Sequence, residues 1–299
     1  MALKGKKEGK NDGEMSFLEH LEELRWHIIR SVIAIVVFMI VAFVFKNMLF
    51  DNIILAPKSP TFPTNRFLCN FSHFLAAKLN FSDPDVLCIN KQELNLISIK
   101  MSGQITTHIV VALVAGLIIA FPFVIREFWS FFRPALHANE ARYARGAVLA
   151  SSFLFFAGVL FGYFLLAPLS VHFLGSYRIS ETVVNQINIR SYIGTITSIC
   201  LATGLIFELP IIAFFLTKIG IITPEFMRKY RRHAIVIIVI VAAIITPPDV
   251  FSQMLVAIPL LLLYEVSIGI SARVIKKKEK DHKEFMEENS SEEIVKETS

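Results

Sequence analysis

Long apolar runs, separated by short charged connections, dominate the pattern of the chain. A helix needs about 20 apolar residues to cross the hydrocarbon core of a bilayer. Four of the runs reach this length comfortably, and two more come close to it. The predicted spans are Trp26–Phe45, Ile105–Ile125, Ala147–Leu174, Tyr192–Leu216, Ala234–Thr246 and Met254–Ser271. We therefore predict an all-α membrane protein with six transmembrane helices.

The last two spans are short. Ala234–Thr246 makes about 20 Å of helix, against about 30 Å of hydrocarbon. Either the bilayer is locally thinned around these helices or they pack within the bundle away from lipid. Pro247 and Pro248 then predict a tight turn between the two spans.

The polar pattern just before the first span predicts an N-terminal helix that runs into this span. Ser16 and Glu19 form a capping box, which favours a helix start at this point. Apolar side chains share one face and glutamates share the other, so we expect this helix to lie against the membrane surface. Interfacial helices usually carry Lys and Arg, so an acidic face suits a cationic ligand better than lipid. The alternative is a solvated acidic face at a helix N-terminus.

Composition agrees with a membrane protein. The 299 residues are 54% hydrophobic, include 27 Phe and have a mean hydropathy of +0.58, well above a soluble protein. The net charge of +5 arises from Lys and Arg beside the apolar runs, as in cytoplasmic loops, and does not indicate nucleic-acid binding. Three cysteines are too few for a disulfide scaffold or a metal cluster, so we predict no cofactor and no metal.

Basic residues in the short connections predict the orientation. They cluster in the second connection, in the fourth connection and after the last span, whereas the third and fifth connections hold only Arg178 and Arg190. The positive-inside rule then places both termini in the cytoplasm. Residues 1–14 and 273–299 are polar and charged, and we predict that both tails are disordered around a membrane domain of residues 15–272.

The first connection, residues 46–104, is long and is expected outside. It carries Cys69 and Cys88. Because an external compartment is oxidising, a disulfide between them is expected, with two unpaired thiols as the alternative.

One carboxylate lies inside a predicted span. Glu208 would cost about 2.5–3.5 kcal/mol at the bilayer centre if charged, which makes it a functional candidate. The structural alternative is a protonated carboxyl group bonded to a neighbouring helix. Pro210 frees a backbone carbonyl one turn earlier, and this carbonyl could help satisfy the group.

Two further segments hold candidate residues. Residues 127–142 form an aromatic connection that contains Glu140, and Trp129 with its phenylalanines could alternatively form an interfacial belt. Thr246 and Gln253 bracket the double proline, where polar side chains favour partners on other helices.

Catalytic and transport signatures are missing from the sequence. We find no internal repeat, phosphate-binding glycine loop, HExxH helix or nucleophile elbow. The chain is therefore not predicted to be an enzyme. Two alternatives remain: a proton-coupled small-solute transporter that uses Glu208 as a relay, and an intramembrane hydrolase.

Four ordered motifs resemble one known family. His20-Leu-Glu-Glu-Leu-Arg25 is similar to its N-terminal His-Leu-x-Glu-Leu-Arg, and Trp129-x-Phe-x-x-Pro-x-Leu136, followed by Glu140, is similar to its first cytoplasmic loop. Phe207-Glu-x-Pro210 and Thr246-Pro-Pro-Asp-Val-Phe-Ser-Gln253 match two further signatures. The chain resembles TatC, the multi-spanning subunit of the twin-arginine protein translocase, over about residues 16–272.

The resemblance implies a cup-shaped six-helix bundle in the inner membrane of a bacterium. Such a protein recognises twin-arginine signal peptides of folded cargo, works with the single-span partners TatA and TatB in an oligomeric complex, and uses the proton-motive force. The implied signal-peptide site comprises Glu23, Arg25, Phe131 and Glu140. The implied partner-docking or intramembrane polar positions are Glu208, Thr246, Asp249 and Gln253.

The chain departs from the family pattern in two places. Arg126-Glu127 stands where many members have Tyr-Gln, which adds opposite charges near the implied signal site. The external connection with Cys69 and Cys88 is also longer than usual.

Overall fold

The structure is a computed structural model that describes residues 17–79, 88–90, 94–132, 143–180, 182, 185–246 and 250–297. The predicted N-terminal tail, residues 1–14, lies outside this range. The elements in chain order are α1 (Phe17–Val44), η1 (Met48–Ile54), η2 (Ala56–Lys58), α2 (Pro63–Leu79), β1 (Leu96–Ile97), α3 (Gly103–Phe132), α4 (Tyr143–Phe161), η5 (Gly162–Leu166), α5 (Ala167–Ser176), β2 (Ile187–Asn188), α6 (Ile189–Ile206), α7 (Leu209–Lys218), α8 (Pro224–Lys229), α9 (Arg231–Ile245) and α10 (Val250–Glu297).

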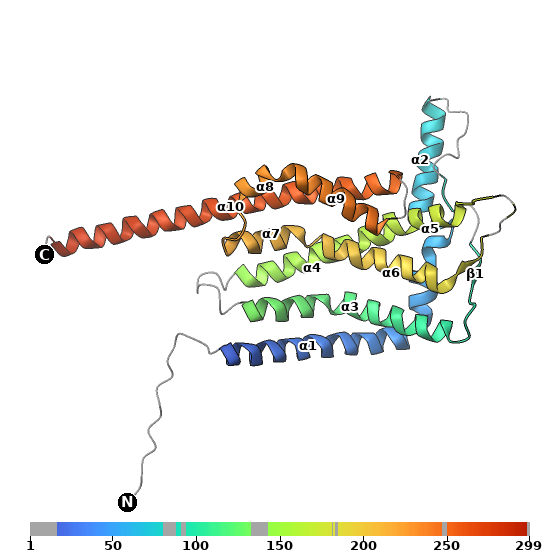
Figure 1. Ribbon diagram of the computed structural model, residues 1–299, viewed down its shortest axis with the longest axis horizontal. Helices are drawn as coiled ribbons and strands as arrows, with labels where there is room; N and C mark the ends of the chain where they lie inside the picture. Colours follow the sequence, from blue (N-terminus) through green and yellow to red (C-terminus); the bar gives the residue numbers. More distant parts are fainter. Residues whose placement is uncertain are drawn as a thin grey trace, which may run out of the picture.

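Long apolar helices run alongside one another through the molecule (Figure 1). Within the described part of the chain, five helices are long and apolar enough to cross a membrane. They are Leu21–Val44, Gly103–Phe131, Gly146–Ser176, Ile189–Lys218 and Gln253–Lys280. We call the end that carries α2, β1 and β2 the outer end. The start of α1 and the end of α10 both lie toward the opposite, inner end (Figure 1).

The remaining predicted span corresponds to α9, which has 15 residues and is about 22 Å long. Ile238 and Ala242 are buried in a cluster shared with the preceding and following spans. Most other apolar side chains of α9 are exposed, among them Val236, Ile237, Ile240 and Ile244. Of the two explanations for its short length, this exposure favours a thinned bilayer over enclosure within the bundle.

Residues 17–25 form the first turns of α1 and not a separate helix. The sequence from Phe17 to Val44 contains neither Gly nor Pro, so nothing interrupts the helix where the polar part meets the apolar part. The expected interfacial helix is therefore continuous with the first span.

The main neighbour of α1 is α3, and the two helices meet closely at Gly116. A Cβ atom at Gly116 would lie 2.6 Å from the backbone nitrogen of Met39 and 2.8 Å from its Cα. Only a glycine lets the two backbones approach this closely. The contact at Gly116 therefore fixes how α1 lies against α3.

Small residues and a proline shape the contact between the α4–α5 span and α6. A Cβ atom at Gly158 would lie 2.6 Å from the carbonyl oxygen of Thr203. Pro168 lacks an N–H group, so the carbonyl of Phe164 loses its helical partner, and a π-helical turn precedes the proline. The hydroxyl of Thr64, from α2, donates to this carbonyl. The proline thus creates an attachment point for the outer end.

The described parts of the long connection between α1 and α3 are folded. Its helix α2 stands across the ends of the long helices (Figure 1), and β1 pairs in parallel with β2. The Tyr192 hydroxyl donates to the carbonyl of Ile54 (3.0 Å), and the Tyr163 hydroxyl donates to that of Ile53 (2.8 Å). We call the described parts of residues 46–102, together with β2, the outer cap.

The C-terminal segment differs from the prediction. Residues 273–297 continue α10 as a helix, whereas the sequence was expected to be disordered there. This stretch contains no Gly or Pro, and Lys280 pairs with Glu284 one turn later (3.3 Å). Strong helix formers with favourable charge spacing therefore extend the last span well past the bundle (Figure 1).

Candidate functional site

Charged side chains meet at the inner end, between α1 and α3. Nδ1 of His27 lies 2.7 Å from Oε2 of Glu127, and Nε2 of the same ring lies 4.0 Å from Oε1 of Glu23. The guanidinium group of Arg30 lies 3.8 Å from the same oxygen of Glu127. We call Glu23, His27, Arg30, Glu127 and Phe131 the inner polar cluster.

Helical spacing explains how the sequence builds this cluster. Glu23, His27 and Arg30 are separated by four and three residues, so they share one face of α1. Glu127 and Phe131 are separated by four residues and share one face of α3. The pairing of α1 with α3 then brings the two faces together.

One carboxylate oxygen of the cluster is buried without a partner. Oε2 of Glu23 has no hydrogen bond to any group in the described residues, although the side chain as a whole is 35% exposed. Buried polar atoms are nearly always hydrogen-bonded, and an exception needs an explanation. A ligand that donates hydrogen bonds would satisfy this oxygen.

Aromatic rings border the cluster. Phe131 lies edge-on to the ring of His27, with centroids 6.1 Å apart. Trp129 is only 5% exposed and packs edge-on against Phe215 of α7 (5.5 Å). Trp129 therefore does not belong to an exposed aromatic belt, because its indole is buried against other helices.

The other residues of the implied signal site are not brought into the cluster by the described structure. Arg25 is exposed and stacks on the neighbouring Trp26, with its guanidinium carbon 5.6 Å from the ring centroid. Glu140 lies outside the described residues, as does Asp249 of the partner-docking set.

Glu208 sits where α6 ends and α7 begins, and it is 7% exposed. The Ser151 hydroxyl of α4 donates to its Oε2 (2.6 Å), whereas Oε1 has no partner in the part of the chain that the structure describes. A cross-helix bond is thus present, as the structural alternative predicted, but it satisfies only half of the carboxyl group.

Thr246 and Gln253 both donate hydrogen bonds to backbone carbonyls of α9. The Thr246 hydroxyl donates to the carbonyl of Ala242 in its own helix (2.9 Å), and the Gln253 amide donates from α10 to the carbonyl of Val239 (3.2 Å). A hollow of about 420 Å³ lies beside Thr246, lined by Leu174, Ser191, Gly194, Thr195, Ser198, Ile199, Ile245 and Thr246. Its hydroxyl-rich lining suits a helix that carries a polar group.

Sequence reasoning missed His27 and Arg30, and it noted Glu127 only as a departure from the family pattern. His27 follows Glu23 by four residues, which was a usable signal. The contact between His27 and Glu127 joins two helices 100 residues apart, and no local pattern indicates it.

Comparisons with known proteins show which family this chain is similar to. The family model of the Sec-independent protein translocase protein (TatC) matches residues 19–259. The Sec-independent protein translocase protein TatC of Blattabacterium sp. subsp. Periplaneta americana is 40% identical, over 89% of this chain and 98% of that protein. The TatC of Aquifex aeolicus is 33% identical, over 90% of this chain and 100% of that protein.

Solved structures show the same likeness. Two crystal structures described as the twin-arginine translocase receptor TatC match with TM-scores of 0.59 and 0.62. They are 32% and 34% identical to the chain, cover 86% and 84% of it, and are each covered over 99% of their length. These proteins are translocase components, which gives no support to a solute transporter. The chain is a multi-spanning membrane protein that belongs to the TatC family, the Sec-independent protein translocase subunit of the twin-arginine system.

Proposed function

We propose that the inner polar cluster receives the arginine side chains of twin-arginine signal peptides on folded cargo. In this proposal Glu23 and Glu140 are the carboxylates that bind the guanidinium groups, Phe131 is an aromatic wall, and Arg25 flanks the site. The observation that carries the proposal is the buried Oε2 of Glu23, which has no hydrogen-bond partner among the residues that the structure describes.

Guanidinium is the cation that suits such an oxygen best. It is planar and presents paired N–H donors that match a carboxylate in two parallel bonds, whereas a lysine ammonium group is a single point charge. Arg30 already places a guanidinium 3.8 Å from Glu127, and His27 contacts the same oxygen. Glu127 therefore already has partners within the chain, so of the two carboxylates in the inner polar cluster Glu23 is the one proposed to bind an incoming arginine.

The remaining assignments follow the family and the positive-inside rule. Both termini and the inner polar cluster are proposed to face the cytoplasm of a bacterial cell, on the inner membrane. Single-span partners of the TatA and TatB type are proposed to dock at Thr246, Asp249 and Gln253, with Glu208 as an intramembrane polar contact. We also propose that the protein works as an oligomer, draws on the proton-motive force and has no catalytic residue.

Crosslinking of a signal peptide tests the proposal. The full-length protein in lipid nanodiscs is mixed with a peptide that carries a photoreactive group next to its two arginines. We expect crosslinks to residues near Glu23, and at least a tenfold weaker affinity when both arginines are replaced by lysine, because each lost bidentate pair removes about 1.5–3 kcal/mol.

The matched control is a peptide that keeps both arginines and has lysines at two other positions. Its positive charge is at least that of the twin-lysine peptide, so a difference in affinity between the two reports on the arginines and not on total charge. Equal binding of the twin-arginine and twin-lysine peptides would contradict the assignment. Crosslinks confined to the outer cap would contradict it as well.

A further inference from the structure

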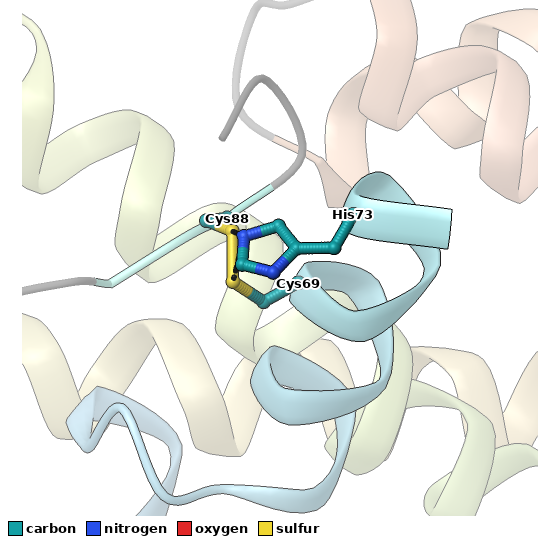
Figure 2. Close-up of side chains that lie close together, drawn as sticks. All are labelled: Cys69, His73 and Cys88. Atoms are coloured by element: carbon teal, nitrogen blue, oxygen red, sulfur yellow. Dashed lines mark hydrogen bonds between the residues drawn. A yellow bond between two sulfur atoms is a disulfide. The ribbon is translucent and has the colours of Figure 1, made fainter. Parts of the chain in front are cut away.

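The outer cap holds a cluster of two sulfurs and one imidazole. Cys69 and Cys88 are joined by a disulfide, and the ring of His73 lies beside it (Figure 2). Nε2 of His73 is 3.9 Å from the sulfur of Cys69 and 3.8 Å from that of Cys88. The imidazole therefore lies beside both sulfurs of the disulfide.

The cluster combines one local pair with one distant residue. Cys69 and His73 are separated by four residues and face the same way from α2 (Figure 2). Cys88 comes from the segment 88–90 and is only 8% exposed, whereas His73 is exposed. The buried side holds a sulfur, and the exposed imidazole leaves a path of entry from the outside.

Contacts other than the disulfide hold both parts of the cluster. Two residues after Cys88, Asn90 is 5% exposed and donates to the carbonyls of Pro57 (3.3 Å) and Pro168 (3.2 Å). At the start of α2, Asn65 donates to the carbonyl of Ser59 (2.7 Å). Asn65 also donates to the carbonyl of Pro57 (3.4 Å), so Pro57 in η2 anchors both segments. These contacts do not depend on the disulfide, and we expect them to keep the two sulfurs near each other after reduction.

The distances fit a tetrahedral zinc site after a small adjustment. With Zn–S bonds of about 2.3 Å and Zn–N bonds of about 2.05 Å, tetrahedral angles separate sulfur from nitrogen by about 3.6 Å and the two sulfurs by about 3.8 Å. The nitrogen–sulfur distances of 3.8 and 3.9 Å are already near this value. Only the two sulfurs must move apart, once their bond is broken.

We propose that the reduced outer cap binds one Zn²⁺ through Cys69, His73 and Cys88, and that the disulfide and the zinc site are alternative states of the same cluster. The three ligand atoms lie within 4.8 Å of one another. A three-ligand site leaves the fourth position to water or to an external ligand. The number of cysteines predicted no metal, whereas the histidine one turn after Cys69 is the signal for this site.

The two states interconvert with balanced chemistry. A dithiol reductant delivers two electrons and two protons to the Cys69–Cys88 bond, which yields two thiols and a disulfide on the reductant. Zn²⁺ then replaces the two thiol protons, which are released to solvent. In the reverse direction, a disulfide oxidant accepts two electrons from the two thiolates and two protons from solvent and becomes a dithiol, while the Cys69–Cys88 bond forms again and Zn²⁺ is released.

Metal binding by the purified full-length protein tests the proposal. The protein in detergent is reduced with a phosphine, which takes an oxygen atom from water as the disulfide gains its protons. After removal of the phosphine, the protein is titrated with Zn²⁺ against a chromophoric chelator. We expect one Zn²⁺ per chain in the reduced protein and none at this affinity in the oxidised protein. A parallel titration with Co²⁺ should show thiolate charge-transfer absorption.

Variants assign the ligands. We expect His73→Gln to weaken Zn²⁺ binding by at least about 10- to 100-fold, since loss of a direct ligand should exceed the loss of an outer-shell partner. Cys69→Ser with Cys88→Ser should abolish it. His108→Gln and Cys200→Ser are the matched controls and should bind as the parent chain does. The proposal would be overturned if the reduced parent chain bound no Zn²⁺. It would also be overturned if the double serine variant bound Zn²⁺ as tightly as the reduced parent chain.

Discussion

The outer cap and the inner polar cluster are held together by different kinds of partner. Backbone carbonyls hold the outer cap: Asn90 donates to two of them, and Tyr163 and Tyr192 of the long helices donate to carbonyls of the cap. A disulfide also joins α2 to the segment of Cys88. In the inner polar cluster, ionisable side chains contact one another, as His27 and Glu127 do. A side-chain carboxylate can rotate to exchange one partner for another, whereas a backbone carbonyl keeps the direction that the fold gives it. The contacts of the outer cap therefore favour stability, whereas those of the inner polar cluster suit the recognition of a ligand.

The largest expected effect is on the outer cap. Replacing Cys69 and Cys88 by serine removes a link between residues 19 positions apart, which the chain-entropy model values at roughly 3 kcal/mol of unfolding free energy. Thermal unfolding in detergent should show this loss, while signal-peptide affinity and export stay unchanged because the cap is remote from the inner polar cluster. Mass spectrometry of non-reduced peptides from the parent chain checks the premise: two free thiols in protein from the cell envelope would contradict it.

The inner polar cluster should show the opposite behaviour. Glu23→Gln removes one charge-assisted pair with an arginine, so we expect affinity for a twin-arginine peptide to fall about 10- to 100-fold, or about 1.5–3 kcal/mol, with unchanged thermal stability. Glu22→Gln is the matched control, because Glu22 is the exposed neighbour on the same helix. Equal losses in the two variants would mean that general charge, and not Glu23, attracts the peptide.

Glu208 lies between α6 and α7, outside both the outer cap and the inner polar cluster. Its variants test a third kind of contact, a hydrogen bond between two spans. Glu208→Ala leaves the Ser151 hydroxyl without its acceptor, at a cost of about 1–3 kcal/mol, whereas the amide of Glu208→Gln still accepts that bond. We expect Glu208→Ala to impair export more than Glu208→Gln, and both to retain peptide binding. Paired export and crosslinking assays measure this. Normal export by Glu208→Ala would leave Glu208 with a structural role alone.

The smallest expected effect on stability is at the partner-docking positions. Gln253→Ala removes one bond to the carbonyl of Val239, worth about 0.5–1 kcal/mol. If a partner helix docks there, copurification of TatA- or TatB-type subunits should fall although the protein stays folded. Gln104→Ala, at the start of α3, provides a glutamine control elsewhere on the outer side. Full recovery of both partners with Gln253→Ala would argue against docking at this position.

The spans were predictable from the sequence because twenty-residue apolar runs have few alternatives in lipid. The C-terminal helix was not, because its charged composition resembles that of disordered tails, and only the spacing of pairs such as Lys280 and Glu284 favours a helix. Only some residues of the inner polar cluster were predictable from the sequence. Motif position indicated Glu23 and Phe131, but His27 meets Glu127 only through the register of α1 on α3, which depends on the whole helix pair.

Gly116 lies near the middle of α3, where it contacts Met39 of α1. A change at this contact would shift the inner end of α1. Met39, which lies against Gly116, is 16 residues along α1 from Glu23, a lever arm of about 24 Å. A side chain at residue 116 would act as a wedge, and a tilt of α1 by about 5° would swing Glu23 by about 2 Å over that arm. Such a displacement would separate His27 from Glu127 without altering any residue of the inner polar cluster. Substitutions at residue 116 can therefore disable a site that they do not touch.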